Sequence, residues 1–345
     1  MPATFVKAGQ AASHRASARS LWASRRWFLV VVAAIYIACG VMVFRMLDRS
    51  TLERALSLPL TLVASLLGLS LVNYLVRAWR WLVLSSFLGF KVPPLRNVLY
   101  YLAGYALTAT PGKAGEAVRL WFLKSGHGVP YVRSIAIMLA DRLLDMWAVL
   151  ILVLVCFADF SRHLWQGVAV AVVILALSLP IVFPRRFLPL LRVGMRLAPK
   201  RRRLWAKARR VMHSMADLSH WRTYGLTLLP SVVGWAAEGF GLYLLLRYFG
   251  ANVSPFNAIF VFAFSMIIGA ISMLPGGLGS TEVTAVVLLT ALGVDIDAAV
   301  ASTALVRITT FWFAVVIGVG LLPVAIGAAS RAGGLRIAPK PRVAP

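Results

Sequence analysis

Long apolar stretches alternate with short polar or basic segments along most of the chain. Six of these stretches reach the roughly 20 residues that an α-helix needs to cross a bilayer. The predicted spans run over residues 27–46, 58–82, 134–157, 164–183, 223–246 and 300–326. The hydrophobic pattern therefore predicts an all-α polytopic membrane protein.

Two further apolar regions are each interrupted by a Pro-Gly sequence. The arms around the first break, 97–110 and 114–124, are too short to cross a membrane, and residues 256–274 and 280–292 repeat the arrangement around the second break. Exposed backbone is tolerated at membrane depth only where protein or water satisfies its polar groups. We therefore predict two re-entrant helical hairpins beside six full transmembrane helices.

The two interrupted regions resemble each other in sequence. The interval from Gly128 to Arg142 is fourteen positions, and so is the interval from Gly293 to Arg307. The predicted break residues are Pro111, Gly112 and Gly115 in the first region and Pro275, Gly276, Gly277 and Gly279 in the second. Paired, interrupted hydrophobic segments are typical of transporters built from inverted repeats, whose site lies where the repeats meet.

The positive charge predicts the orientation and the boundaries of the parts. Lys and Arg concentrate in residues 1–26, 184–222 and 328–345, and such segments are usually cytoplasmic. We expect a basic N-terminal tail at 1–26, a single transmembrane domain at 27–327 and a Pro/Arg-rich tail at 328–345. Both termini and the basic loop at 184–222 then lie on the cytoplasmic side of a bacterial inner membrane. Repeat one, about 58–157, and repeat two, about 223–326, then run in opposite directions.

Composition excludes a soluble protein. The chain is 60% hydrophobic with a mean hydropathy of +0.83, more apolar surface than a globular fold can bury. The net charge of +25 lies beside membrane spans, so we expect membrane lipids as partners, with anionic lipid at the basic loop, and no nucleic acid. Residues 204–218 place apolar and basic side chains on opposite helical faces, which favours a helix in the membrane interface. The alternative is that this charge only sets the topology.

Charged residues at bilayer depth are costly and mark candidate functional sites. Glu238 is included because it corresponds to Arg77 when Gly89 is aligned with Gly250. The candidate substrate-binding residues are Arg80, Glu116, Arg119, Asp141, Arg142, Asp145, Glu238, Glu282 and Arg307.

Arginine next to the free N–H groups of a helix start favours phosphate binding. We expect Arg119, Arg142 and Arg307 to contact a phosphate, at helices that begin after the two breaks. Glu116, Asp145 and Glu282 would then be counter-charges or headgroup contacts. The structural alternative is that buried Glu/Arg pairs only join the repeats, and that Arg77, Arg80 and Arg119 extend to the membrane surface.

Several enzyme classes and cofactors are not supported. Leu107 and Ala114 stand where a phosphate-binding ATPase loop needs glycine and Ser/Thr, and Glu282 stands where a dinucleotide fingerprint needs its last glycine. The five histidines fall in predicted loops or tails, so we expect no metal site. We expect no cofactor, no catalytic residue and no enzymatic activity.

The motifs together resemble the lysylphosphatidylglycerol synthase transmembrane-region family, which includes the flippase-like N-terminal membrane domain of the multiple peptide resistance factor. They are residues 77–81, 111–119, 141–145, 275–282 and Arg307, and the resemblance covers about 25–326. Two departures are Asp141, where the family more often has Glu, and the missing Asn before Pro111.

The resemblance implies movement of a lipid between leaflets, and we expect this to occur without ATP hydrolysis. The lipid is a phospholipid, an aminoacyl-phospholipid, or a glycolipid or isoprenoid-linked lipid. The alternative is a non-transporting scaffold or accessory subunit for a lipid-modifying or glycosyltransferase enzyme. An intramembrane lipid transferase is a further alternative, although no nucleophile or metal set supports it.

Overall fold

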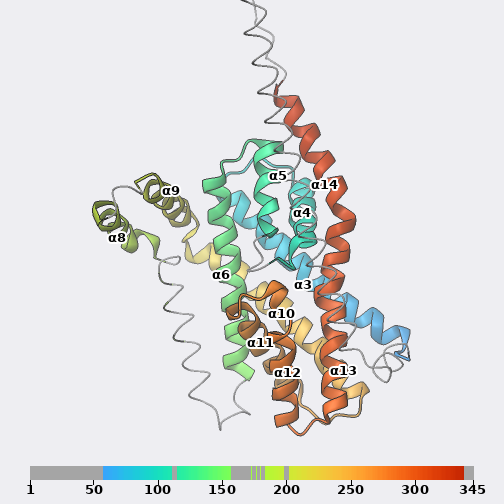
Figure 1. Cartoon of the computed structure of the whole chain (residues 1–345). Coiled ribbons are helices and arrows are strands. Elements are labelled where there is room, and N and C mark those ends of the chain that lie inside the picture. The colour runs from blue at the N-terminus through green and yellow to red at the C-terminus, as the bar shows by residue number, and fades with distance from the viewer. Residues whose placement is uncertain are drawn as a thin grey trace, which may run out of the picture. The chain divides into compact units, whose positions relative to one another are not determined.

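The computed structural model describes residues 57–110, 115–156, 183–197 and 202–337, with isolated positions 172, 176 and 179. Regular secondary structure in these residues is helical, and none of them lies in a strand (Figure 1). This confirms the predicted all-α class. The predicted span at 27–46, most of that at 164–183 and the segment 111–114 lie outside the described residues.

Apart from two helices in the basic segment 184–222, the described helices follow the predicted apolar stretches. They are α3 (Leu60–Phe87), α4 (Pro94–Ala103), η1 (Gly104–Leu107), α5 (Val118–His127), α6 (Tyr131–Cys156), α8 (Pro184–Leu197), α9 (Arg202–Leu218), α10 (Trp221–Tyr248), α11 (Pro255–Ile271), η6 (Pro275–Gly277), α12 (Ser280–Ala291), α13 (Ile296–Arg307), η7 (Ile308–Trp312) and α14 (Phe313–Ile337). The 3-10 turns η1 and η6 lie in the two interrupted regions, and η7 is a π-helical turn that joins α13 to α14.

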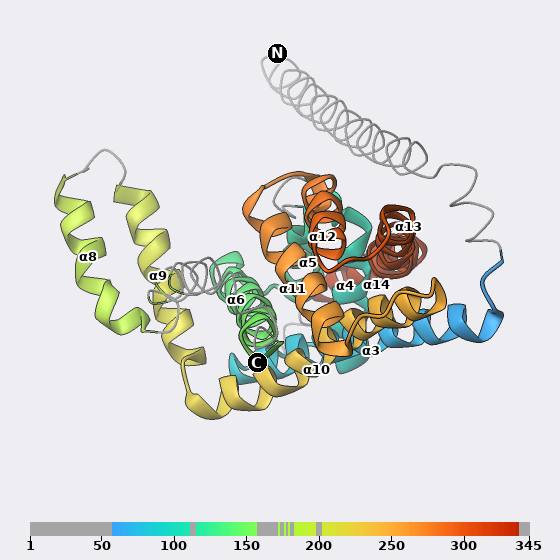
Figure 2. The ribbon, with the colours of Figure 1, turned by 90° about the horizontal axis from the view of Figure 1, so that it is seen from below.

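Three described helices are long and apolar enough to cross a membrane, judged by length and composition. They are Leu60–Phe87, Arg222–Tyr248 and Ile296–Gly333. Helix α6 has 26 residues, but four of its side chains are charged. The basic segment at 184–222 contains two helices, α8 and α9, which pack against each other (Figure 2). The predicted amphipathic helix at 204–218 lies within α9.

The two repeats found in the sequence also share a backbone conformation where their first helices end. Helices α3 and α10 are each followed by a glycine with positive φ, Gly89 at 67° and Gly250 at 79°. The next helix begins in both cases with a proline, at Pro94 and Pro255. A left-handed residue just after a helix satisfies the last carbonyl groups and is usually glycine, and proline suits the first helical turn. The corresponding glycines therefore end corresponding helices.

The buried apolar residues form two cores. The first core gathers side chains of α3, α4, α5, α6 and α14 around Trp81, Tyr101 and Phe122. The second core gathers side chains of α6, α10, α11, α12 and α13 around Phe260 and Leu289. Each interrupted region thus contributes to its own core, and the long helices pass from one core to the other.

The change from one core to the other occurs at charged residues. On α6, Leu144 belongs to the first core and Ala148 to the second, with Asp145 between them. On the continuous α13–η7–α14 helix, Val306 belongs to the second core and Ala314 to the first. Arg307 and the π-helical turn lie between these two residues. A layer of charge therefore separates the two apolar cores.

Helix α14 packs closely against the turn η1, and we predict that this contact depends on Gly318. A Cβ atom at Gly318 would lie 2.1 Å from the backbone nitrogen of Ala106, whereas a Cβ atom at Gly320 would meet nothing within 4 Å. Gly318→Ala should lower the free energy of unfolding by about 1–3 kcal/mol because a backbone has to move. Gly320→Ala, the matched control, should change it by less than about 1 kcal/mol.

Thermal unfolding of the purified variants in one detergent measures the difference. The Gly318→Ala protein should unfold at a clearly lower temperature than the Gly320→Ala protein. Equal unfolding temperatures would contradict the close α14–η1 contact.

Candidate functional site

Equivalent residues of the two repeats form equivalent ion pairs. After the first break, Glu116 Oε2 lies 3.0 Å from Arg142 Nη2 on α6. After the second break, Glu282 Oε1 on α12 lies 2.6 Å from Arg307 Nε on α13. In each repeat the pair therefore links the segment after the break to the next helix. Positions that correspond in the sequences of the two repeats therefore also make corresponding contacts in the structure.

The pair of the first repeat belongs to a larger ionic network. Four guanidinium groups and three carboxylates are joined by contacts of 2.5–3.6 Å between nitrogen and oxygen atoms. Its members are Arg77 and Arg80 on α3, Glu116 and Arg119 after the first break, and Asp141, Arg142 and Asp145 on α6. These seven groups carry one more positive than negative charge. The structure therefore brings together six of the nine predicted site residues and adds Arg77.

Arg80 is held deep in the network. Its Nε and Nη2 both donate to Asp141 Oδ1, at 2.9 and 2.5 Å, and Nη2 also donates to Asp145 Oδ1 at 2.8 Å. Its Nη1 donates to Ser231 of α10 at 2.9 Å. The residue has 0% of its surface exposed, so it does not extend to the membrane surface as the structural alternative proposed. Its geometry joins α3, α6 and α10.

Arg119 is enclosed by aromatic side chains of the first core. Its guanidinium carbon lies 3.9 Å from the ring centroid of Tyr101, and Nε donates to the Tyr101 carbonyl oxygen at 3.0 Å. A cation over an aromatic face is attracted by the ring quadrupole. Arg119 is buried, with 1% of its surface exposed, so here too the extended orientation is wrong. This placement favours a packing role over the predicted phosphate contact.

The second repeat holds its arginine against the break itself. Arg307 Nη2 donates to the carbonyl oxygen of Gly276 at 2.9 Å, while Nε donates to Glu282. Glu282 Oε2 in turn accepts the backbone N–H of Gly279, at 2.7 Å, just before α12 begins. Glu282, the third residue of α12, therefore binds one of the backbone N–H groups at the helix start that we expected to be available to a phosphate.

The second break is strongly bent. Gly276, Gly277 and Gly279 have positive φ angles of 62°, 67° and 86°. Met273, just before the break, has φ of 55°, a rare conformation for a residue with a side chain. In the first break, Pro111 and Gly112 lie outside the described residues, and the N–H of Gly115 donates to Thr110 Oγ1 at 2.6 Å.

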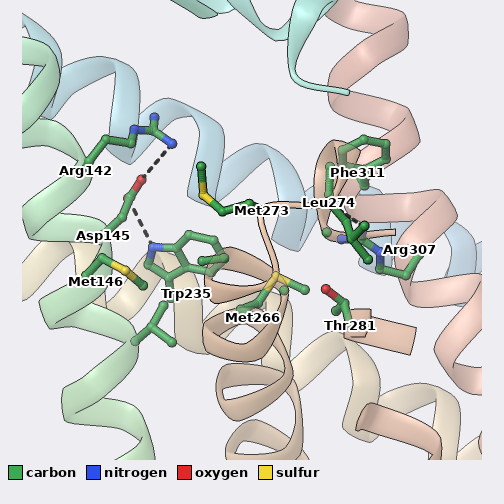
Figure 3. A pocket seen from close by; sticks show the side chains of 15 residues that line it. Arg142, Asp145, Met146, Trp235, Met266, Met273, Leu274, Thr281, Arg307 and Phe311 are labelled. Carbon is green, nitrogen blue, oxygen red and sulfur yellow. Dashed lines mark hydrogen bonds and ion pairs between the residues drawn. The ribbon is translucent and has the colours of Figure 1, made fainter. Parts of the chain in front are cut away.

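A cavity of about 190 Å³ lies between the ion pairs of the two repeats. Figure 3 shows Arg142 and Asp145 on one side and Arg307 with Phe311 on the opposite side. Trp235 lies between them, and its Nε1 donates to Asp145 Oδ1 at 3.2 Å. The remaining wall is mostly apolar, with Met146, Val149, Met266, Ala270, Met273 and Leu274. The cavity therefore combines cationic groups from both repeats with an apolar surface.

Burial separates Arg142 from the other arginines of the network. The Arg142 side chain is 27% exposed, whereas those of Arg77, Arg80 and Arg119 are at most 6% exposed. Among the described residues of the network, Arg142 and Asp145 line the cavity. Arg142 is therefore the guanidinium of the first repeat that a ligand in the cavity can reach.

The other predicted residues have different surroundings. Glu238 is buried on α10, one helical turn from Trp235, and is not part of the cavity wall. His127, which we expected in a loop, is the last residue of α5, and His213 lies within α9, in the helix predicted for the basic loop. In the part of the chain that the structure describes, no three His, Cys, Asp or Glu residues are grouped to hold a metal ion.

Two site residues were not among those predicted from the sequence. Arg77 Nη2 lies 2.7 Å from Asp145 Oδ2, and the Arg77 guanidinium carbon is 5.4 Å from the ring of Trp235. Both residues could have been found from helical spacing, because Arg77 is three positions before Arg80 and Trp235 three before Glu238.

Comparison with known proteins identifies the family of the chain. The profile of the lysylphosphatidylglycerol synthase TM region matches residues 26–318, which include both breaks and all nine predicted site residues. A UPF0104 membrane protein of Pyrococcus horikoshii is 26% identical over 275 residues, covering 72% of this chain and 82% of that protein. A UPF0104 membrane protein of Methanothermobacter thermautotrophicus is 26% identical over 270 residues, covering 71% and 79%. The chain is therefore a multi-pass membrane protein that belongs to the lysylphosphatidylglycerol synthase TM region family.

Proposed function

We propose that this protein moves a phosphate-bearing lipid between the leaflets of the membrane without hydrolysing ATP. The observation that carries the proposal is the cavity whose opposite sides present Arg142 and Arg307, one from each repeat. A lipid headgroup would bind between these arginines while its tails stay in the bilayer. The protein would have no catalytic residue, because binding and release suffice for this movement.

Arg142 is suited to bind a phosphate and release it again. Guanidinium groups bind phosphate oxygens through paired, charge-assisted hydrogen bonds. The contact between Arg142 Nη1 and Asp145 Oδ2, at 3.6 Å, is the longest in the network. Asp145 also contacts Arg77 and Arg80 at 2.7 and 2.8 Å, so it stays neutralised when Arg142 turns to a ligand. The exchange leaves no buried charge without a partner.

Arg307 provides a second phosphate contact. Its bonds to described residues use Nε and Nη2, and Nη1 makes no bond to any of them. Its guanidinium carbon lies 4.7 Å from the Phe311 ring centroid, and both residues line the cavity. A headgroup that leaves Arg142 for Arg307 passes from the first repeat to the second. A site between two inverted repeats is where such transporters bind their substrate, and the repeats rock or gate around it to give alternating access.

The proposal includes the topology predicted from the sequence. Six full spans and two re-entrant hairpins place the charged layer between the two cores near the middle of the bilayer, where a headgroup must cross. The apolar part of the cavity wall, with Trp235, Met266 and Met273, then contacts the glycerol and the first tail carbons. Both termini and the basic loop lie on the cytoplasmic side of the inner membrane.

We predict that transport requires both arginines of the cavity. Arg142→Gln and Arg307→Gln should each slow transbilayer movement of a fluorescent phosphatidylglycerol on the order of tenfold or more, because each removes a charged hydrogen-bond donor. Arg247→Gln is the matched control, since Arg247 is exposed on the last turn of α10 and lies outside the cavity wall. Vesicles that contain purified protein, with quenching of outer-leaflet fluorescence, provide the measurement.

Each result decides something about the proposal. Loss of movement in the two cavity variants, with normal rates in Arg247→Gln, supports a flippase. Wild-type vesicles that are no faster than protein-free vesicles, with anionic, zwitterionic and glycolipid analogues tried, overturn the proposal and favour the scaffold. Normal rates in Arg142→Gln would exclude this cavity as the route.

We also predict that two arginines of the network differ in their effect on stability. Arg80→Gln should lower the free energy of unfolding by about 3 kcal/mol, because it removes a fully buried partner of Asp141 and Asp145. Arg142→Gln should cost about 1 kcal/mol, because its carboxylates keep other arginines and its side chain is partly exposed. Unfolding in detergent measures both variants. If Arg142→Gln unfolds as easily as Arg80→Gln, loss of transport in Arg142→Gln would only report a damaged fold.

A further inference from the structure

A second cavity lies in the helical hairpin α8–α9, outside the site between the repeats. Its volume is about 300 Å³. The first turn of α8 and the end of α9 enclose it, and these helices lie side by side in Figure 2. The lining residues are Phe183, Pro184, Arg185, Arg186, Ala216, Ser219 and His220. None of them lines the cavity between the Glu–Arg pairs.

The cavity of the hairpin is cationic and has no acidic residue in its described wall. Arg185 and Arg186 are exposed, and neither forms an ion pair with a described residue. Between residues 184 and 222 the sequence has twelve Lys or Arg residues and one acidic residue, Asp217. One carboxylate leaves most of the positive charge of this segment uncompensated within it, so the segment attracts an anion.

Apolar side chains lie exposed on the same hairpin. One face of α9 packs against α6 and buries Met215 and Leu218. Other apolar residues are left exposed, with 46% of the surface accessible for Phe183, 61% for Leu190 and 57% for Leu204. Exposed apolar residues among arginines and lysines are typical of helices that lie in the interface of an anionic membrane.

We propose that the α8–α9 cavity binds the phosphate headgroup of an anionic phospholipid. Arg185 and Arg186 supply the guanidinium groups for the phosphate, and Phe183 and Leu190 contact the acyl chains. The charge of the segment is complementary to such a lipid, and the apolar residues distinguish it from a soluble phosphate. The site shares no residue with the proposed transport cavity, so it stands whether or not the protein moves lipids.

Native mass spectrometry of the full-length protein tests this site with phosphatidylglycerol as the probe. We expect Arg185→Gln combined with Arg186→Gln to weaken retention of the lipid about thirtyfold, from about 1 kcal/mol for each basic residue near a membrane surface. Arg203→Gln combined with Lys207→Gln is the control, because both residues are exposed on α9 and neither lines the cavity. The control pair removes the same charge but no group of the cavity wall, so the variant should retain the lipid within about threefold of the wild type.

Competing probes separate the other possible occupants. Phosphatidylcholine should be retained far less than phosphatidylglycerol, and millimolar inorganic phosphate should not displace the bound lipid. The proposal is overturned if both double variants lose lipid equally, since that indicates unspecific attraction, or if inorganic phosphate displaces the lipid fully. The proposal is also overturned if the Arg185/Arg186 variant retains phosphatidylglycerol like the wild type but no longer binds an acidic soluble protein that the wild type binds.

To separate this site from the transport cavity, Arg142→Gln is measured in the same experiment. It should retain phosphatidylglycerol at the hairpin like the wild type. The Arg185/Arg186 variant, in turn, should move lipid through the cavity between Arg142 and Arg307 at the rate of the wild type. A lipid that is lost in Arg142→Gln and kept in the Arg185/Arg186 variant would overturn the hairpin site and leave the transport proposal intact.

Discussion

The structure depends on the pairing of charges that the chain places among apolar residues. A guanidinium or carboxylate group without a partner in such surroundings is very costly, and removal of one member of a buried pair leaves the other uncompensated. Arg77 and Arg80 on α3 therefore require Asp141 and Asp145 on α6 as partners. Glu116 likewise requires Arg119 and Arg142. These requirements hold α3, α6 and the first interrupted region together where the two cores meet.

The two repeats meet the same requirement in unequal ways. In the first, each carboxylate contacts at least two arginines, so one contact can be exchanged while the others persist. In the second, Arg307 is held by Glu282 and by the Gly276 carbonyl, and Glu282 also fixes the start of α12. Release of Arg307 would therefore free the bent segment that holds Met273 in a strained conformation. The first repeat therefore holds its charges through several shared contacts, and the second holds Arg307 through one carboxylate and one carbonyl oxygen.

The sequence predicted the helices and the repeat but only part of the contacts. Apolar length and the Pro-Gly breaks were enough to find α3, α6, α10 and the interrupted regions, because these signals are local. Charged residues at bilayer depth were enough to select Glu116, Arg142, Glu282 and Arg307 as site residues, but the ion pair between Glu116 and Arg142 was found only in the structure. The aromatic enclosure of Arg119 and the bond from Trp235 to Asp145 depend on which helices pack together, and a single sequence does not specify that. The closing of the α12 start by Glu282 follows a known capping pattern, in which an acidic residue at the third helical position reaches back.

The count of charge in the network bears on the kind of headgroup that the cavity suits. Four guanidinium groups and three carboxylates leave one positive charge in excess, and the partly exposed member, Arg142, lies at the cavity wall. A phosphodiester carries one negative charge, so its arrival brings these seven groups to balance without displacing a carboxylate into apolar surroundings. A headgroup with no negative charge leaves the excess in place, and one with two reverses its sign. Under the proposed function, a singly charged phosphodiester at Arg142, which is the phosphate form of a glycerophospholipid, would balance this excess, and the apolar wall beside Trp235 would accommodate the rest of that molecule.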